Sequence, residues 1–230
     1  DGKTPDPYYD DASGAELVGA LCEQLEKGQS VSEYLCAAIV CRADAEEPLI
    51  ALLDCGEEEK TMYALNLLGE MSSDAAVPKC VELAAFGDGD EHVKELAAEL
   101  LSAKCEVCKE QLLRLYGGVT NDAQELFCDV LSRCARDERI FQTLVDAFRT
   151  HPMQTTLYSS FLARYGDERA LPALYEAIEK QGIDFAEFRE LKFAIETLGG
   201  EYENKRDFSE DAIYRKLKSE NAERKKNVKH

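Results

Sequence analysis

Apolar residues recur at helical spacing along most of the chain. Leu17, Leu21 and Leu25 stand four residues apart, which places them on one face of a helix that Gly28 would end. Pro48 falls just inside the start of a later helix, where its missing N–H costs little. No strictly alternating run and no hairpin turn between such runs indicates a strand. The pattern therefore predicts an all-α protein.

The helical pattern repeats at an interval of about thirty residues. Asp137–Phe148 (DERIFQTLVDAF) and Asp167–Ile178 (DERALPALYEAI) share their Asp-Glu-Arg start, a central Leu and a late Ala. The second helix of each expected pair closes on a leucine, namely Leu68, Leu101, Leu131, Leu162 and Leu198. Because one amphipathic pair cannot bury its apolar face alone, the repetition predicts pairs stacked into a solenoid.

Two segments resemble a known repeat family. Val93–Leu101 (VKELAAELL) is similar to the second helix of a HEAT-like repeat of the short, roughly thirty-residue kind. Leu68–Met71 (LGEM) resembles the Leu-Gly ending of that helix. The chain departs from the family pattern at Ser102, Ser132 and Ala163, which replace Gly, and at Lys60 and Thr61, which replace Val-Arg. The resemblance covers about residues 45–200. The resemblance implies an α-α superhelix, that is, a right-handed solenoid of helical pairs. The HEAT-like repeats of bilin lyases are similar in length to the repeats of this chain.

The same pattern predicts three parts of the chain. Residues 1–13 carry two prolines and no apolar periodicity, so we expect a flexible arm. Residues 14–204 form the HEAT-like domain, with 14–43 as a divergent capping pair. Residues 205–230 form a C-terminal helix, closed onto the domain by Phe208, Ile213 and Leu217, and then a basic tail.

Charge limits the class of partner. The net charge is −19 at pH 7, with 46 acidic and 27 basic residues. Such a surface repels phosphate backbones, which argues against a nucleic-acid partner. No apolar run is long enough to predict a membrane-spanning helix. Residues 205–230 carry nine basic and five acidic residues, so the rest of the chain is more acidic than the total charge indicates and favours a basic partner. The tail is either solvated or docked on the acidic body or on a separate acidic partner.

The nine cysteines are an odd number scattered through apolar helical stretches. We interpret most of them as small buried hydrophobic residues in a reducing compartment, the cytoplasm. No signal peptide is recognisable, although the first residue is Asp and a preceding segment could have been removed. The one Cys-x-x-Cys motif, Cys105 to Cys108, lacks the strand-helix setting of redox motifs. Joining it with Cys128 and Cys134 gives spacing poorly suited to tetrahedral zinc, so neither metal nor cofactor is expected.

Enzymes with HEAT-like folds need residues that this chain lacks. Deoxyhypusine-type hydroxylases bind iron through His-Glu pairs, and none occurs among the three histidines here. HEAT-like DNA glycosylases need a basic concave face and aromatic residues around a flipped base, whereas this chain is acidic and has no Trp. A HEAT-like enzyme or a pigment-lyase-type accessory protein stays as the alternative function.

A polar row is the candidate binding site. Two positions before each closing leucine stand Asn66, Glu99, Asp129, Ser160 and Glu196. Three positions earlier stand Tyr63, Leu96, Leu126 and Phe193, which we expect in the core. Second helices usually line the concave surface of a solenoid, where extended partners lie. The sequence therefore predicts a non-enzymatic scaffold that binds a protein or peptide, favouring a basic one. The alternative is that the row is only a solvated face.

Overall fold

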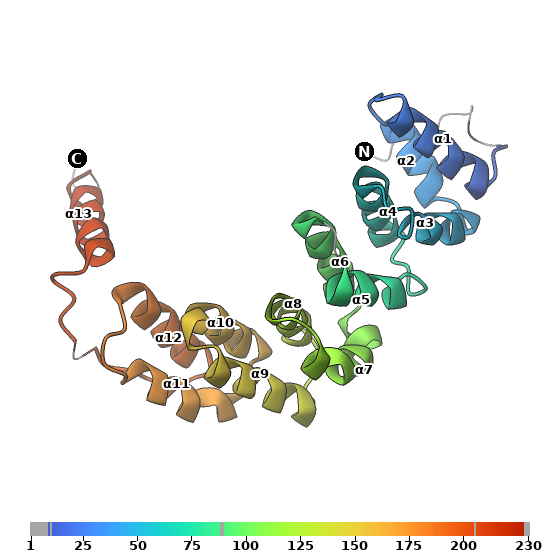
Figure 1. Cartoon of the computed structure of the whole chain (residues 1–230). Coiled ribbons are helices and arrows are strands. Elements are labelled where there is room, and N and C mark those ends of the chain that lie inside the picture. The colour runs from blue at the N-terminus through green and yellow to red at the C-terminus, as the bar shows by residue number, and fades with distance from the viewer. Residues whose placement is uncertain (1–8, 10, 88–89, 205, 228–230) are drawn as a thin grey trace. The chain divides into compact units, whose positions relative to one another are not determined.

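The computed structural model describes residues 9, 11–87, 90–204 and 206–227. Within these ranges it contains thirteen α-helices and no strand, which confirms the all-α prediction (Figure 1). Most of the predicted arm, residues 1–8 and 10, lies outside the described residues, as do residues 205 and 228–230 of the C-terminal segment. No helix in the described ranges combines the length and apolar character needed to cross a bilayer.

The chain divides after Leu131 into two compact units, so residues 14–204 span both of them. The first unit contains α1 (Gly14–Glu26), α2 (Glu33–Val40), α3 (Glu46–Leu52), α4 (Glu58–Glu70), α5 (Val77–Phe86), α6 (Glu91–Ala103), α7 (Cys105–Leu115) and α8 (Asn121–Leu131). The second unit contains α9 (Glu138–Thr150), α10 (Thr155–Tyr165), α11 (Leu171–Ile178), α12 (Phe185–Thr197) and α13 (Ala212–Asn227).

The first unit is built from antiparallel helical pairs in two layers. Each odd-numbered helix packs against the even-numbered helix that follows it (Figure 1). The even-numbered helices also pack in succession, α2 on α4, α4 on α6 and α6 on α8. Leu68, Leu101 and Leu131, which close three of them, are fully buried. Each pair thus covers the apolar face that its neighbour cannot cover alone.

A glycine fixes the start of the first pair. Ser13 accepts a hydrogen bond from the Glu16 amide, and the Glu16 carboxylate accepts one from the Ser13 amide, which forms a capping box. Gly14 donates its N–H to Asp44 at 2.8 Å. A Cβ on Gly14 would lie 2.3 Å from the backbone nitrogen of Ala45. The start of α1 therefore approaches the turn before α3 more closely than any side chain would allow.

Lysines join neighbouring pairs within the first unit. Lys79 contacts Asp54 at 2.5 Å, and Lys104 contacts Asp74 at 2.7 Å. Lys60 is the most buried of the three, with a side chain only 9% exposed. Its ammonium group contacts Glu26 at 2.8 Å and Glu57 at 2.9 Å, and these hydrogen bonds raise its pKa above the usual lysine value. The chain has fewer basic than acidic residues, and these contacts place three of its lysines where neighbouring pairs meet.

The Asp-Glu-Arg motif of the second unit has a structural role. Arg169 contacts Asp167 at 2.8 Å and Glu138 of the preceding motif at 2.7 Å. Its guanidinium also lies over the Phe141 ring, 4.2 Å from the centroid. Tyr165 donates its hydroxyl hydrogen to the Asp137 carbonyl at 2.9 Å. The motif therefore ties α9/α10 to α11/α12.

The C-terminal helix packs differently from the expectation. Phe208 is buried against Phe188, at a ring distance of 4.9 Å, as the sequence predicts. Ile213 is 46% exposed, so the prediction that it closes the core is wrong. Tyr214 instead packs on Phe185, with 5.1 Å between ring centroids. The first turn of α13 carries this contact, and Leu217, one turn later, is only partly covered.

We expect Asp167→Asn to lower the free energy of unfolding by about 1–2 kcal/mol at pH 7, because it removes a part-buried charge-assisted hydrogen bond to Arg169. The Asp167 side chain is 7% exposed, and the hydrogen bonds from Arg169 lower its pKa. Its ionised form therefore stabilises the fold above the unfolded pKa of about 3.9, and this contribution is lost as pH falls through the lower folded pKa.

Urea unfolding at a series of pH values measures the effect. The gap between the parent protein and the variant should begin to narrow below about pH 4 and should vanish below the lowered folded pKa of Asp167. Asp137→Asn is the matched control, because Asp137 holds the same motif position with a side chain 19% exposed. An equal loss in both variants would show that the burial of Asp167 is not what matters.

Candidate functional site

The candidate site is a hollow of about 330 Å³ on the surface of the first unit, between α4 and α6. From α4 it is lined by Leu65, Asn66, Gly69 and Glu70, and from α6 by Leu96, Glu99, Leu100 and Ala103. These residues fall at i, i+3 or i+4 spacing along each helix, so each helix presents one continuous face to the hollow.

Two of the residues that line the hollow are small. Gly69 lies within α4, and a Cβ built there would meet nothing within 4 Å. Ala103 is the last residue of α6 and offers a single methyl group. Glycine inside a helix is unfavourable by about 0.5–1 kcal/mol relative to alanine. Gly69 is the second-last residue of α4, so this cost is smaller there than in the middle of the helix.

The lining combines an apolar floor with polar groups at the rim. Leu65 and Leu100 are buried, and Leu96 is half-buried. Asn66 and Glu99 are exposed, as is Glu70. This arrangement suits an amphipathic cation such as lysine or arginine, whose aliphatic stem can cover apolar surface while its charged head meets a carboxylate.

The structure brings together two of the five predicted site residues, Asn66 and Glu99. Asp129 is half-buried on α8, the next even-numbered helix. Ser160 and Glu196 belong to the second unit. Ser160 donates its hydroxyl hydrogen to the Leu157 carbonyl at 2.7 Å, and Glu196 contacts Lys192 at 3.3 Å, both within their own helices.

The apolar residues beside the row are not core residues, and the expectation that they are buried is wrong. Tyr63, Leu96 and Leu126 are half-buried, and Phe193 is 61% exposed. Each lies three residues before a member of the row. Residues three apart lie on the same face of a helix. A side chain one turn away from an exposed residue is therefore itself close to solvent.

Sequence reasoning missed Glu70 and Gly69. Glu70 stands four residues after Asn66, so helical spacing alone could have placed both on one face. Gly69 was interpreted only as part of a helix ending, whereas it opens the hollow. The participation of Gly69 depends on how closely α4 and α6 approach, which no local pattern encodes.

A second hollow, of about 430 Å³, lies in the second unit and is a weaker candidate. It is lined by Arg136, Asp137, Glu138, Asp167, Glu168 and Arg169. Arg169 is already engaged by two of these carboxylates. Arg136 donates to the Gly166 carbonyl at 2.8 Å. Both arginines of this hollow therefore already bind groups of the protein itself, which gives them a structural role.

The cysteines are less uniformly buried than expected. All nine are free thiols. Cys80, Cys108, Cys128 and Cys134 are buried, Cys22, Cys36 and Cys105 are half-buried, and Cys41 and Cys55 are exposed. The interpretation as small core residues therefore holds for four of them.

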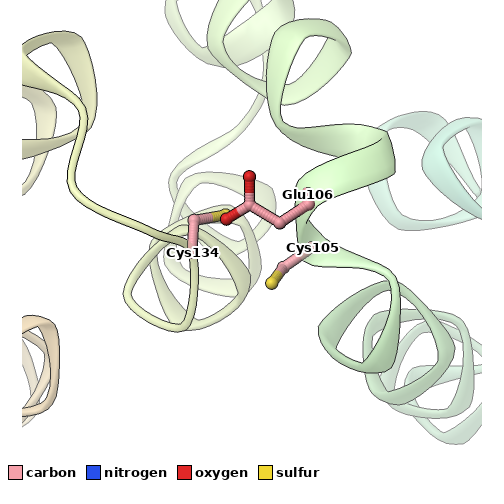
Figure 2. Close-up of side chains that lie close together, drawn as sticks. All are labelled: Cys105, Glu106 and Cys134. Carbon is pink, nitrogen blue, oxygen red and sulfur yellow. The ribbon is translucent and has the colours of Figure 1, made fainter.

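The Cys-x-x-Cys motif has the wrong chemistry for a redox centre. Cys105 is the first residue of α7 and Glu106 is the second. Figure 2 labels both side chains. Cys108 is fully buried, and burial raises the pKa of its thiol to about 12. A reactive cysteine needs a lowered pKa and access to solvent. Cys134, also labelled in Figure 2, belongs to the second unit, and we assign no metal site to these residues.

No family model matches this chain, and no curated protein matches it. The assignment of the candidate site therefore depends on its geometry.

We expect Cys41 and Cys55 to react first with Ellman's reagent in the folded protein, because they are exposed. Burial raises the pKa of Cys80, Cys108 and Cys128 to about 12, so these thiols should react only after unfolding. Counting modified thiols before and after adding urea measures both classes.

The double variant Cys41→Ser, Cys55→Ser is the control and should remove the fast phase. Purified protein should also hold no stoichiometric zinc by metal analysis. Fast modification of Cys108 in the folded protein, or zinc lost on replacing Cys105 and Cys108, would contradict this assignment.

Proposed function

We propose that this protein is a HEAT-like, non-enzymatic scaffold whose even-numbered helices bind a basic segment of a partner protein. The hollow between α4 and α6 is the observation that carries the proposal, because it combines an apolar floor with the Glu70 and Glu99 carboxylates. Lysine and arginine side chains have the matching form, an apolar stem with a cationic head.

Electrostatics favours the same class of partner. The chain carries a net charge of −19, which attracts a basic segment over the range of a Debye length, about 8 Å at physiological salt. Attraction of this kind mainly raises the rate of association and discriminates against acidic competitors. The apolar floor then contributes contact energy that salt does not screen.

The packing of helical pairs supports a solenoid of the HEAT-like kind. In the first unit four pairs follow one another, and their even-numbered helices make a continuous row. Such a row offers a surface longer than one pocket, which suits a segment of chain better than a small substrate. Nine free thiols fit the reducing cytoplasm as its place of action.

A peptide of alternating lysine and leucine provides a direct test of the charge requirement. Replacing Glu70 and Glu99 together by Gln should weaken its binding about two- to fivefold at about 0.01 M salt, because two exposed charge contacts are lost. The difference should shrink at about 0.15 M salt, where screening is stronger. Fluorescence anisotropy with the labelled peptide measures the affinities.

Glu82→Gln is the charge control, since Glu82 lies on α5, an odd-numbered helix, with a side chain 59% exposed. A peptide with Glu in place of Lys is the ligand control and should not bind. Equal affinity for the parent and the double variant at low salt would count against the hollow as the site.

A second test fills the hollow. Gly69→Leu should reduce binding of the lysine-leucine peptide about tenfold, because the new side chain occupies the floor. Fold stability should stay equal or rise, since leucine is a good helix former and nothing lies within 4 Å of the new Cβ.

Gly19→Leu is the matched control. Gly19 also lies inside a helix, is exposed, and has open space around its would-be Cβ. Thermal unfolding should show similar stability for both variants, and only Gly69→Leu should lose binding. Unchanged binding by Gly69→Leu would remove the hollow from the proposal.

A further inference from the structure

The even-numbered helices of the first unit carry an apolar ladder beside the polar row. The ladder consists of Tyr63 on α4, Leu96 on α6 and Leu126 on α8. All three side chains are half-buried and so retain surface for a partner. Each stands three residues before Asn66, Glu99 or Asp129, and so one helical turn away from the polar row.

The spacing of the ladder follows from helix packing. α4 packs on α6 and α6 packs on α8, so the ladder has one member on each of three successive neighbours. Axes of packed helices lie about 8–10 Å apart. A partner that contacts every member must therefore present an apolar side chain about every 10 Å.

An extended segment does not meet this spacing. In a strand, side chains on the same side recur every second residue, at about 6.6 Å and then about 13 Å. An α-helix rises about 1.5 Å per residue, so seven residues advance about 10.5 Å. Seven residues also return to nearly the same face, within about 20°. The ladder thus matches the heptad interval of a helix.

The polar row determines the second property of the partner. Asn66, Glu99 and Asp129 flank the ladder on one side, and two of the three are carboxylates. A partner helix lying across α4, α6 and α8 with its apolar stripe on the ladder would place an adjacent flank against this row. Lysine or arginine on that flank would complement the carboxylates.

We propose that the partner segment is a basic amphipathic helix whose apolar residues recur every seven positions, lying across α4, α6 and α8. This inference rests on the proposed function and adds the conformation and register of the partner. The chain's own α13 does not fit, because the position seven residues after Ile213 is Glu220. The proposed partner segment is therefore not α13.

Three peptides of equal charge test the proposal on the full chain. The first, of about 21 residues, spans three heptads with leucine at every seventh position and lysine on one neighbouring flank. The second has the same composition with leucine at every fifth position. The third keeps the heptad order but carries two internal prolines that prevent a helix. The first should bind about tenfold more tightly than the others, because only it can bury its leucines on the ladder.

Variants at Leu96 test whether the preference for the heptad peptide depends on the ladder. Leu96→Ala should weaken binding of the heptad peptide about tenfold and that of the five-spaced peptide by a smaller factor, because Leu96 lines the hollow but only the heptad peptide contacts the whole ladder. Leu96→Met keeps the apolar volume and should retain most of the binding, which separates a loss of contact from a loss of fold. Val107→Ala is the control, since Val107 is 54% exposed on α7, an odd-numbered helix.

The outcomes separate the two proposals. If all three peptides bind equally and the Glu70, Glu99 double variant weakens each of them, the basic-partner function stands and the helix inference is wrong. If none binds, both are overturned. Sedimentation without peptide provides a further check: self-association that Leu96→Ala abolishes would assign the ladder to a second copy and overturn the inference.

Discussion

The constraint on which this structure depends is that no helical pair can cover its own apolar face. In the first unit, Leu68, Leu101 and Leu131 are fully buried, and the even-numbered helices that they close pack on one another in succession. The core therefore runs along the stack instead of lying at one centre. A change at one pair acts first on its immediate neighbours, as expected where stability is a sum of pair and interface contributions.

The fold class was predictable because it depends on local periodicity. Leucines at four-residue spacing and the recurring closing leucines identified the helices, and Leu162 and Leu198 are buried as that pattern requires. The division after Leu131 was not visible, because helical periodicity continues on both sides of it. The prediction that Ile213 is buried was wrong for a related reason. An apolar residue shows which face of a helix is apolar, but not whether another element packs against that face.

The candidate site was predictable only in part. The polar row identified Asn66 and Glu99, which share one hollow. The neighbouring residues Leu96 and Phe193 were assigned to the core because they are apolar, although they share the exposed face. The residue type indicates whether a side chain is stable in the core, whereas its exposure depends on which neighbouring helix packs over it. The same reasoning explains why Gly69 was missed, since the absence of a side chain leaves no pattern to detect.

The lysine contacts between pairs have a consequence for the response of this protein to ionic strength. The contacts of Lys79 with Asp54 and of Lys104 with Asp74 are direct, at 2.5 Å and 2.7 Å, much shorter than the Debye length of about 8 Å at physiological salt. The repulsion among the excess carboxylates acts over longer distances, so added salt weakens it first. Moderate salt should therefore stabilise the folded chain while it weakens the binding of a basic partner.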